Sequence, residues 1–196
     1  MYICISYNSY YLFSKLLNTL RFIMLISTSR KPSSKTRTFC KNLSHALDCE
    51  YINRGKMSMR ELQLKSRSLG YDNVALVYQM KGNPSKISFV SNEGEEILVI
   101  LGSVNTTNER LHIKTDELSF YSDYPELNPL KDIFPIVKDS RDKSSKANHI
   151  YVEKLEEDFE DHKDYNKKIA IIHFFNRDGE DTGLKVNVRK VINNLS

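Results

Sequence analysis

Tryptophan is absent from this sequence of 196 residues, and glycine and proline are scarce, with seven and five residues. Collagen-like and low-complexity chains need far more of both residues, so the composition excludes those classes. The three cysteines, Cys4, Cys40 and Cys49, form an odd set without C-x-x-C or Cys/His ligand spacing. This pattern excludes a disulfide-stapled scaffold and a zinc site. We therefore expect structural thiols in a reducing compartment, no metal or cofactor, and a chain long enough for a globular core.

Long apolar runs are also missing, and the segment 1–23 comes nearest to one. Asn8, Lys15 and Arg21 interrupt it, whereas a membrane-spanning helix needs about 20 mostly apolar residues. A secretory signal would carry positive charge before its apolar run and small residues at a cleavage site, and the segment has neither. We interpret 1–23 as an N-terminal extension outside the fold, with translation starting at Met24, and we expect no membrane partner.

Acidic residues are few in the first half of the chain. Residues 1–100 hold 14 Lys and Arg against 7 Asp and Glu, and residues 101–196 hold 15 against 18, so the halves carry +7 and −3 within a net charge of +4. This asymmetry indicates that the first half faces a polyanion. On charge alone, nucleic acid is the leading partner.

Two helices are predicted in the first half. The segment 33–47 repeats apolar residues at helical spacing. Ser58 and Glu61 form a capping-box pattern that starts a second helix, and Gly70 is a suitable left-handed residue to end it. Strands are predicted around these helices at 24–29, 50–53, 74–78, 86–90, 97–104 and 111–113, with a turn at 82–84.

The second half begins irregularly. Residues 116–148 contain Pro125, Pro129 and Pro135, which break any long element. An exposed loop is predicted at 138–146, and strands are predicted at 149–152, 169–175 and 184–191. The alternation of strands and helices predicts an α/β fold, built as α+β layers, with two similar halves at about 24–105 and 106–196.

The segment between the first strand and the first helix is rich in groups that bind phosphate. A helix N-terminus attracts anions because its first N–H groups are free. The segment adds hydroxyl groups and cations, from Thr28, Ser29, Ser33, Ser34, Arg30, Lys31 and Lys35. It is not a Walker loop, since no glycine lies between Met24 and Arg54. A simpler explanation stays open, in which Ser33 or Ser34 only caps the helix and the cations are solvated.

A second basic cluster lies at the next junction of a strand with a helix, at 53–56, and continues with Arg60, Lys65 and Arg67. In a layered α/β arrangement, two such junctions can open on the same edge of the sheet. Residues 24–67 hold ten Lys and Arg against three acidic residues, which is a footprint for several backbone phosphates. The alternative is a solvated charged face.

Catalytic residues are not indicated. The five histidines are scattered, and neither H-E-x-x-H nor G-x-S-x-G occurs. His173 lies inside an apolar strand, which favours a structural role. Two other classes of function stay open: an enzyme that binds a phosphate ligand at the first junction, and a protein-interaction module whose acidic run 153–164 docks a basic ribosomal protein.

Four segments, in order and spacing, resemble the Brix-domain family, particularly its short archaeal members. They are Thr28-Ser29-Arg30-Lys31-Pro32-Ser33 after the first strand, Ile52-Asn53-Arg54-Gly55, the apolar strand 73–78, and Gly82-Asn83-Pro84. The resemblance is specific over about residues 24–90, and the second half is assigned by position and length. It implies a Brix domain at 24–196, with two α/β halves similar to the anticodon-binding domain of class II aminoacyl-tRNA synthetases.

The resemblance implies a ribosome-biogenesis factor without catalytic activity that binds ribosomal RNA or its precursor and assists rRNA processing and subunit assembly. Ribosomal proteins or other assembly factors are further expected partners, and the sequence gives no oligomeric state. The location is expected to be cytoplasmic for an archaeal-type member and nucleolar for a eukaryotic one. The residues expected to contact RNA are Thr28, Ser29, Arg30, Lys31, Ser33, Lys35, Arg37, Lys41, Arg54, Lys56, Arg60, Lys65 and Arg67.

Overall fold

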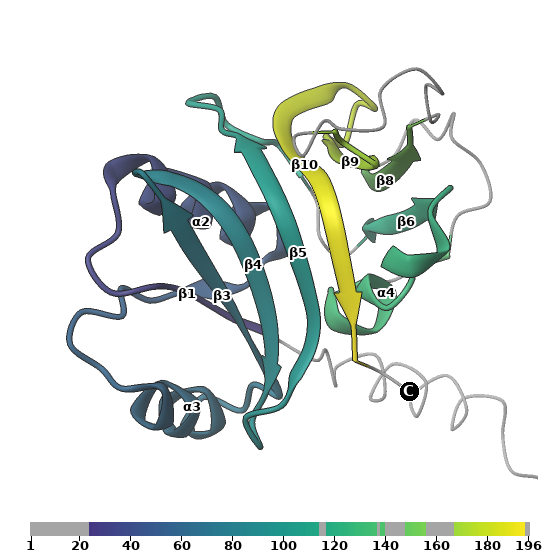
Figure 1. Ribbon diagram of the computed structural model, residues 1–196. Helices are drawn as coiled ribbons and strands as arrows, with labels where there is room; N and C mark the ends of the chain where they lie inside the picture. The colour runs from purple at the N-terminus through teal and green to yellow at the C-terminus, as the bar shows by residue number, and fades with distance from the viewer. Residues whose placement is uncertain (1–23, 114–116, 137, 140–147, 156–166, 195–196) are drawn as a thin grey trace, which may run out of the picture.

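The computed structural model describes residues 24–113, 117–136, 138–139, 148–155 and 167–194 (Figure 1). The predicted extension 1–23 lies outside these residues. The strands are β1 (Met24–Thr28), β2 (Glu50–Tyr51), β3 (Asn73–Met80), β4 (Asn83–Ser91), β5 (Glu96–Asn105), β6 (Ser119–Ser122), β7 (Lys138–Asp139), β8 (His149–Lys154), β9 (Ala170–Phe175) and β10 (Asp181–Asn193). The helices are α2 (Ser34–Leu47), α3 (Met59–Ser68), the 3-10 helix η2 (Pro125–Leu127) and α4 (Leu130–Ile133).

The strands form one sheet in the order β2-β1-β3-β4-β5-β10-β9-β8-β6-β7. In the first half, β1 pairs in parallel with β2 and β3, and β4 and β5 follow antiparallel. In the second half, β6 pairs in parallel with β7 and β8, and β9 and β10 follow antiparallel. The two halves therefore repeat one arrangement of strands on either side of the β5–β10 pair. This repeat confirms the predicted α/β fold with two similar halves.

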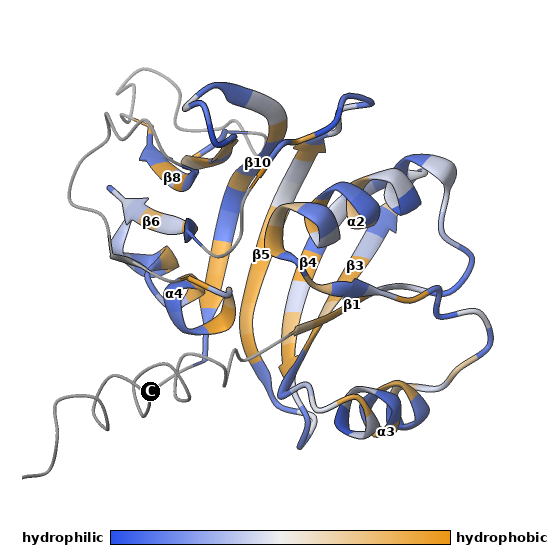
Figure 2. Ribbon diagram, turned by 180° about the vertical axis from the view of Figure 1, so that it is seen from behind, coloured by the Kyte–Doolittle hydropathy of each residue, from blue (hydrophilic) through white to orange (hydrophobic). Residues whose placement is uncertain are grey.

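The helices of the first half cover opposite faces of the sheet. Because successive strand residues point to opposite faces, the neighbours Leu25 and Ile26 of β1 belong to different cores. Ile26 joins the larger core with Phe39 of α2, and Leu25 joins a small one with Leu62 of α3 and Val74. Figure 2 shows α2 and α3 beside the first half of the sheet and α4 beside the second.

The larger core runs through both halves. Its members from the second half include Leu130 of α4, Phe120 of β6 and Phe174 of β9. Phe89 of β4 meets Phe134 across the two halves, with ring centroids 5.9 Å apart in an edge-to-face arrangement. Such a pair adds about 0.5–1.5 kcal/mol beyond the burial of its area. The two halves therefore share one hydrophobic core as well as one sheet.

Several element boundaries differ from the sequence prediction. The predicted strand at 111–113 does not form, because His112 has a φ of +49° that no extended strand permits. The predicted turn at 82–84 is shorter, since Lys81 and Gly82 make it with φ values of +50° and +79°. Pro84 lies within β4 beside an irregularity in the pairing of β3, a position where a missing N–H is tolerated.

Two further predicted boundaries changed. The strand predicted at 50–53 is confined to β2, two residues long. The loop predicted at 138–146 begins with the short strand β7, and its remainder lies outside the described residues.

The two central strands approach each other closely at Gly102. Gly102 of β5 pairs with Val188 of β10, next to a shift of register between Val188 and Lys190. A Cβ atom at Gly102 would overlap the backbone carbonyl oxygen of Asn187. The Asn187 side chain also donates a hydrogen bond to Asn105 Oδ1 at 3.0 Å, across the same pair of strands. Glycine is therefore required here by the distance between two backbones.

We predict that Gly102→Ala is severely destabilising. The added methyl group meets backbone, which cannot rotate away, so the loss should reach or exceed the upper end of the roughly 1–3 kcal/mol typical of overpacking. Urea unfolding of both proteins measures the difference, with Ser103→Ala as the matched control on the same strand. A variant as stable as the wild type would show that β5 and β10 separate without cost.

We predict that Cys40 resists alkylation in the folded protein. Burial raises the pKa of its thiol to about 12, so the reactive thiolate is almost absent at pH 8. Mass spectrometry after iodoacetamide treatment, with and without urea, measures this protection. Rapid labelling of Cys40 without urea would contradict the packing of α2 against the sheet.

Candidate nucleic-acid interface

Three connections meet at one edge of the first half of the sheet. β1, β2 and β3 are parallel, so their carboxyl ends lie together. The connection 29–33 leads from β1 to α2, the connection 52–58 leads from β2 to α3, and the turn 81–82 joins β3 to β4. Figure 1 shows the first two leaving the sheet on the same side, at the left. We call these three connections, with the first turns of α2 and α3, the junction surface.

The junction surface is strongly basic. Its cations are Arg30, Lys31, Lys35, Arg54, Lys56, Arg60 and Lys81, all exposed except the half-buried Arg54. Lys81 was missed by the sequence analysis, because only the return of the β3–β4 hairpin to this edge reveals it. Its signal was its position directly before Gly82 and after a strand, since glycine is typical of a tight turn.

Gln79 of β3 holds the connection 29–33 in place. Its Oε1 accepts hydrogen bonds from the backbone N–H of Ser33 and from the hydroxyl of Thr36, both at 2.8 Å. Its Nε2 donates to the carbonyl oxygen of Lys31 at 3.3 Å. Lys31 has a φ of +54°, a conformation that costs a non-glycine residue about 1–2 kcal/mol. One side chain therefore fixes a strained segment that presents cations.

Two hydroxyl groups of this segment, those of Ser33 and Thr28, differ in their surroundings. Ser33 is the N-cap of α2, since its Oγ accepts from the N–H of Thr36 at 3.1 Å and donates to the carbonyl of Gly82 at 2.6 Å. Thr28 is buried. Capping thus accounts for the Ser33 hydroxyl, and burial keeps the Thr28 side chain away from the surface. Ser29 is half-buried and follows Thr28 at the end of β1.

The start of α3 lies close to the first connection. Ser58 and Glu61 form the predicted capping box, with the N–H of Ser58 donating to Glu61 Oε2 at 2.6 Å. Hydrogen bonding to Ser58 lowers the pKa of Glu61, and the charge of Arg30 lowers it further. Arg30, which leaves β1, therefore lies near the first turn of α3. Arg54 supports its own connection by donating from Nε to the carbonyl of Met57 at 3.1 Å.

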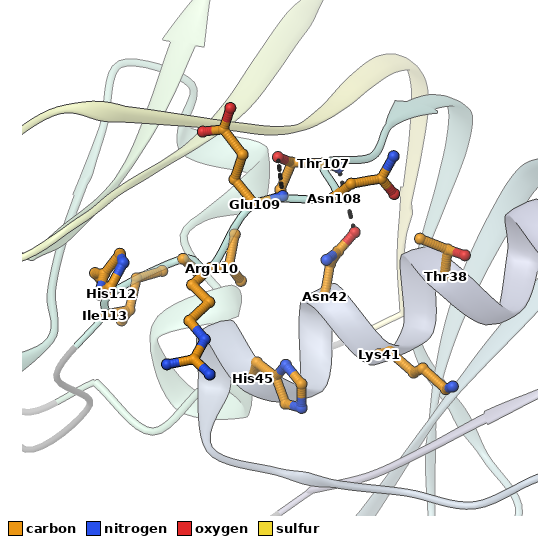
Figure 3. Close-up of a pocket in the computed structure, with 11 residues that line it drawn as sticks. Thr38, Lys41, Asn42, His45, Thr107, Asn108, Glu109, Arg110, His112 and Ile113 are labelled. Carbon is orange, nitrogen blue, oxygen red and sulfur yellow. Dashed lines mark hydrogen bonds between the residues drawn. The ribbon is translucent and has the colours of Figure 1, made fainter.

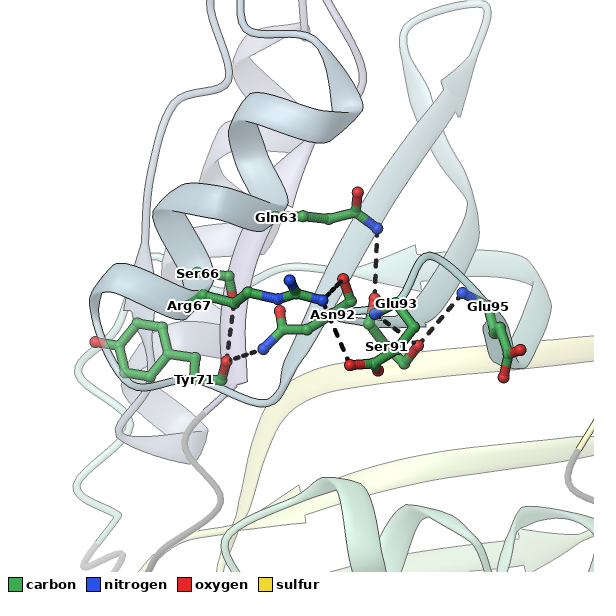
Figure 4. Close-up of polar contacts among 8 residues, drawn as sticks. All are labelled: Gln63, Ser66, Arg67, Tyr71, Ser91, Asn92, Glu93 and Glu95. Carbon is green, nitrogen blue, oxygen red and sulfur yellow. Dashed lines mark hydrogen bonds and ion pairs between the residues drawn. The ribbon is translucent and has the colours of Figure 1, made fainter.

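Lys65 and Arg67 do not join the junction surface. Both lie in the last turn of α3, and Arg67 reaches the turn between β4 and β5 at the opposite edge (Figure 4). Its guanidinium donates to the carbonyl of Asn92 at 2.6 Å and contacts Glu93 at 3.4 Å. The ten basic residues of 24–67 therefore divide between two edges and α2, where Arg37 and Lys41 are exposed.

Only the start of the acidic run 153–164 lies within the described residues, since 156–166 falls outside them. Glu153 of β8 contacts Nε2 of His173 at 3.0 Å, and Asp181 approaches Nδ1 of the same ring at 3.5 Å. The His173 side chain is 13% exposed. His173 therefore links three strands of the second half, which agrees with the structural role expected for it.

Within the described residues, no helix is both long and apolar enough to cross a membrane. Over the same part of the chain, His, Cys, Asp and Glu side chains form no group of three or more suited to a metal ion.

Archaeal proteins are similar in sequence to part of the chain. It is 45% identical over 73 residues to a probable Brix domain-containing ribosomal biogenesis protein of Methanothermobacter thermautotrophicus, covering 37% of this chain and 44% of that protein. It is 35% identical over 115 residues to the protein of the same description in Methanococcoides burtonii, covering 58% and 62%. The matches thus span about half the length of these curated relatives. No family model matches the chain.

Solved structures extend the similarity to most of the chain. The crystal structure of Mil, described as an archaeal Imp4-like protein, matches with a TM-score of 0.69 and 28% identity, covering 87% of this chain and 99% of that one. A probable ribosomal biogenesis protein from Aeropyrum pernix matches with a TM-score of 0.61 and 20% identity, covering 85% and 96%, and shows the fold alone. The predicted resemblance to short archaeal Brix-domain proteins is confirmed.

We predict that Gln79→Ala destabilises the protein by about 1–3 kcal/mol, because it removes the acceptor of the Ser33 N–H and one of the two partners of the buried Thr36 hydroxyl. Urea unfolding measures the loss. Gln63→Ala is the matched control, since that side chain makes one hydrogen bond at 3.4 Å to the carbonyl of Ser91, and it should cost less. Equal losses in the two variants would contradict the role given to Gln79.

Proposed function

We propose that this chain, a homologue of archaeal Brix-domain proteins, is a ribosome-biogenesis factor that binds structured precursor ribosomal RNA through the junction surface. It assists rRNA processing and subunit assembly by holding RNA, and it acts by binding rather than by catalysis. Its place of action is the cytoplasm, where archaeal ribosomes are assembled.

The convergence of cations at one edge of the sheet carries this proposal. Arg30, Lys31, Lys56 and Lys81 come from three connections far apart in the sequence, and all four are exposed. Their spread over one surface suits several phosphates of one RNA backbone. Glu61 is the acidic side chain among them, and the capping box already engages it.

The fixed geometry of the connections adds to this support. Gln79 holds the carbonyl of Lys31 and the N–H of Ser33, and Lys35 Nζ donates to Asn83 Oδ1 at 2.9 Å. Cations on ordered connections lose less conformational entropy when they bind RNA than cations on a flexible chain. Recognition through phosphates depends mainly on the shape of the RNA, because a paired RNA helix hides its base edges in a deep, narrow major groove.

We predict that the triple variant Arg30→Ala/Lys56→Ala/Lys81→Ala weakens RNA binding and flattens its salt dependence. Each phosphate contact contributes about 0.7–0.9 to the slope of log affinity against log salt, so three lost contacts should reduce the slope by about 2 to 3. Fluorescence anisotropy with a ribosomal RNA fragment across a potassium chloride series measures both quantities.

The control for this experiment is Lys65→Ala, which removes an exposed cation from the far end of α3. Its slope should match that of the wild type. If the triple variant binds with wild-type affinity and slope, the junction surface is only a solvated face and the proposed function is wrong.

A further inference from the structure

A groove lies between α2 and the connection that leads from the first half to the second. It has a volume of about 540 Å³ and is lined by Lys41, Asn42 and His45 from α2 and by Thr107, Arg110 and His112 from the connection (Figure 3). We call it the linker groove. Its volume falls within the roughly 300–1,000 Å³ of typical small-ligand sites.

The wall formed by the connection is fixed at both ends. The N–H of Thr107 donates to Asn42 Oδ1 at 3.3 Å, and the hydroxyl of Thr107 accepts from the N–H of Glu109 at 3.1 Å. Further along, the N–H of Arg177 donates to the carbonyl of His112 at 3.1 Å. His112 keeps a φ of +49°, and such strained backbone is concentrated at functional sites.

The polar groups of the groove suit a nucleotide. Arg110 and His45 extend to the same side of it in Figure 3, and Glu109 points to the other side. The Asn42 amide oxygen is held by Thr107, and Figure 3 shows its nitrogen turned toward the groove as a donor. Arginine binds phosphate through its planar fork, and the guanidinium plane of arginine and the ring of histidine also stack on unpaired bases.

A row of basic side chains runs along α2 from its first turn to the linker groove. Arg37, Lys41 and His45 are exposed and recur every four residues along α2, so they lie on one face of the helix about 6 Å apart. The row starts at Arg37, two residues after Lys35 of the junction surface, so both lie near the start of α2 but on different faces of the helix. RNA that passes from the junction surface around the start of α2 therefore meets basic side chains along the helix up to the groove.

We propose that the linker groove receives one unpaired nucleotide of the bound RNA. Its phosphate lies against Arg110 and Lys41, and its base enters the groove beside His45 and the Asn42 amide. An unpaired nucleotide is required because bases within a paired helix are stacked and their edges are not free to enter a pocket. This inference rests on the proposed function, since the same RNA occupies the junction surface.

Two RNA probes test the proposal with the full chain. One is a fully paired duplex of 20 base pairs, and the other is the same duplex with a single bulged uridine. The wild type should bind the bulged RNA more tightly. The double variant His45→Ala/Arg110→Ala should bind the bulged RNA about tenfold more weakly or worse, because a hydrogen bond to a charged group is worth at least that factor. Its affinity for the paired duplex should stay within about twofold of the wild type.

Two comparisons distinguish a failure of the nucleotide site from a failure of the proposed function. The triple variant of the junction surface should weaken both RNAs, and Lys190→Ala, which removes an exposed cation from β10, should weaken neither. If the wild type binds both RNAs equally, or if the groove variant weakens both equally, the nucleotide site is wrong and the proposed function stands. If the wild type binds neither RNA, the proposed function fails and the nucleotide site fails with it.

Discussion

The contact of β5 with β10 is the constraint on which the rest of the structure depends. It joins two half-sheets into one, and Gly102 lets the two backbones approach where a side chain would overlap Asn187. With the half-sheets joined, Phe89 and Phe134 meet in one core. The same joint fixes the start of the connection after β5, because Thr107 follows that strand and bonds to Asn42 of α2. Both the shared core and the linker groove therefore depend on the pairing of β5 with β10.

The two halves repeat one arrangement of strands but differ at their carboxyl edges. In the first half, β1 leads into Arg30 and Lys31 and then into the long helix α2. At the corresponding place, β6 leads into Asp123 and then into the short helices η2, which contains Glu126, and α4. The Asp123 carboxylate accepts a hydrogen bond from the hydroxyl of Tyr151. At these equivalent places, the described residues that follow the first strand are therefore basic in the first half and include the carboxylates of Asp123 and Glu126 in the second.

Local signals in the sequence predicted the elements of the first half, because caps and apolar spacing act over a few residues. The capping box at Ser58 and the glycine end at Gly70 are examples. Placement across the sheet was harder to predict. Lys65 and Arg67 are close in sequence to Arg60, yet the rise of the helix α3 carries them about 8–11 Å away toward the other edge. Lys81 was missed for the converse reason, since a distant hairpin returns to the junction surface.

The pairing of β5 with β10 also has a consequence for folding during synthesis. Asn187 and Ser103 touch across this pair although 84 residues separate them. At about 5–20 residues per second, a ribosome needs about 4–17 s to make that stretch. Throughout this time β5 is the unpaired edge of a half-sheet, with Leu98, Ile100 and Val104 among its apolar side chains. Unpaired apolar edges recruit other strands, so the nascent chain passes through a period in which a chaperone or a neighbouring chain competes with β10 for the same edge.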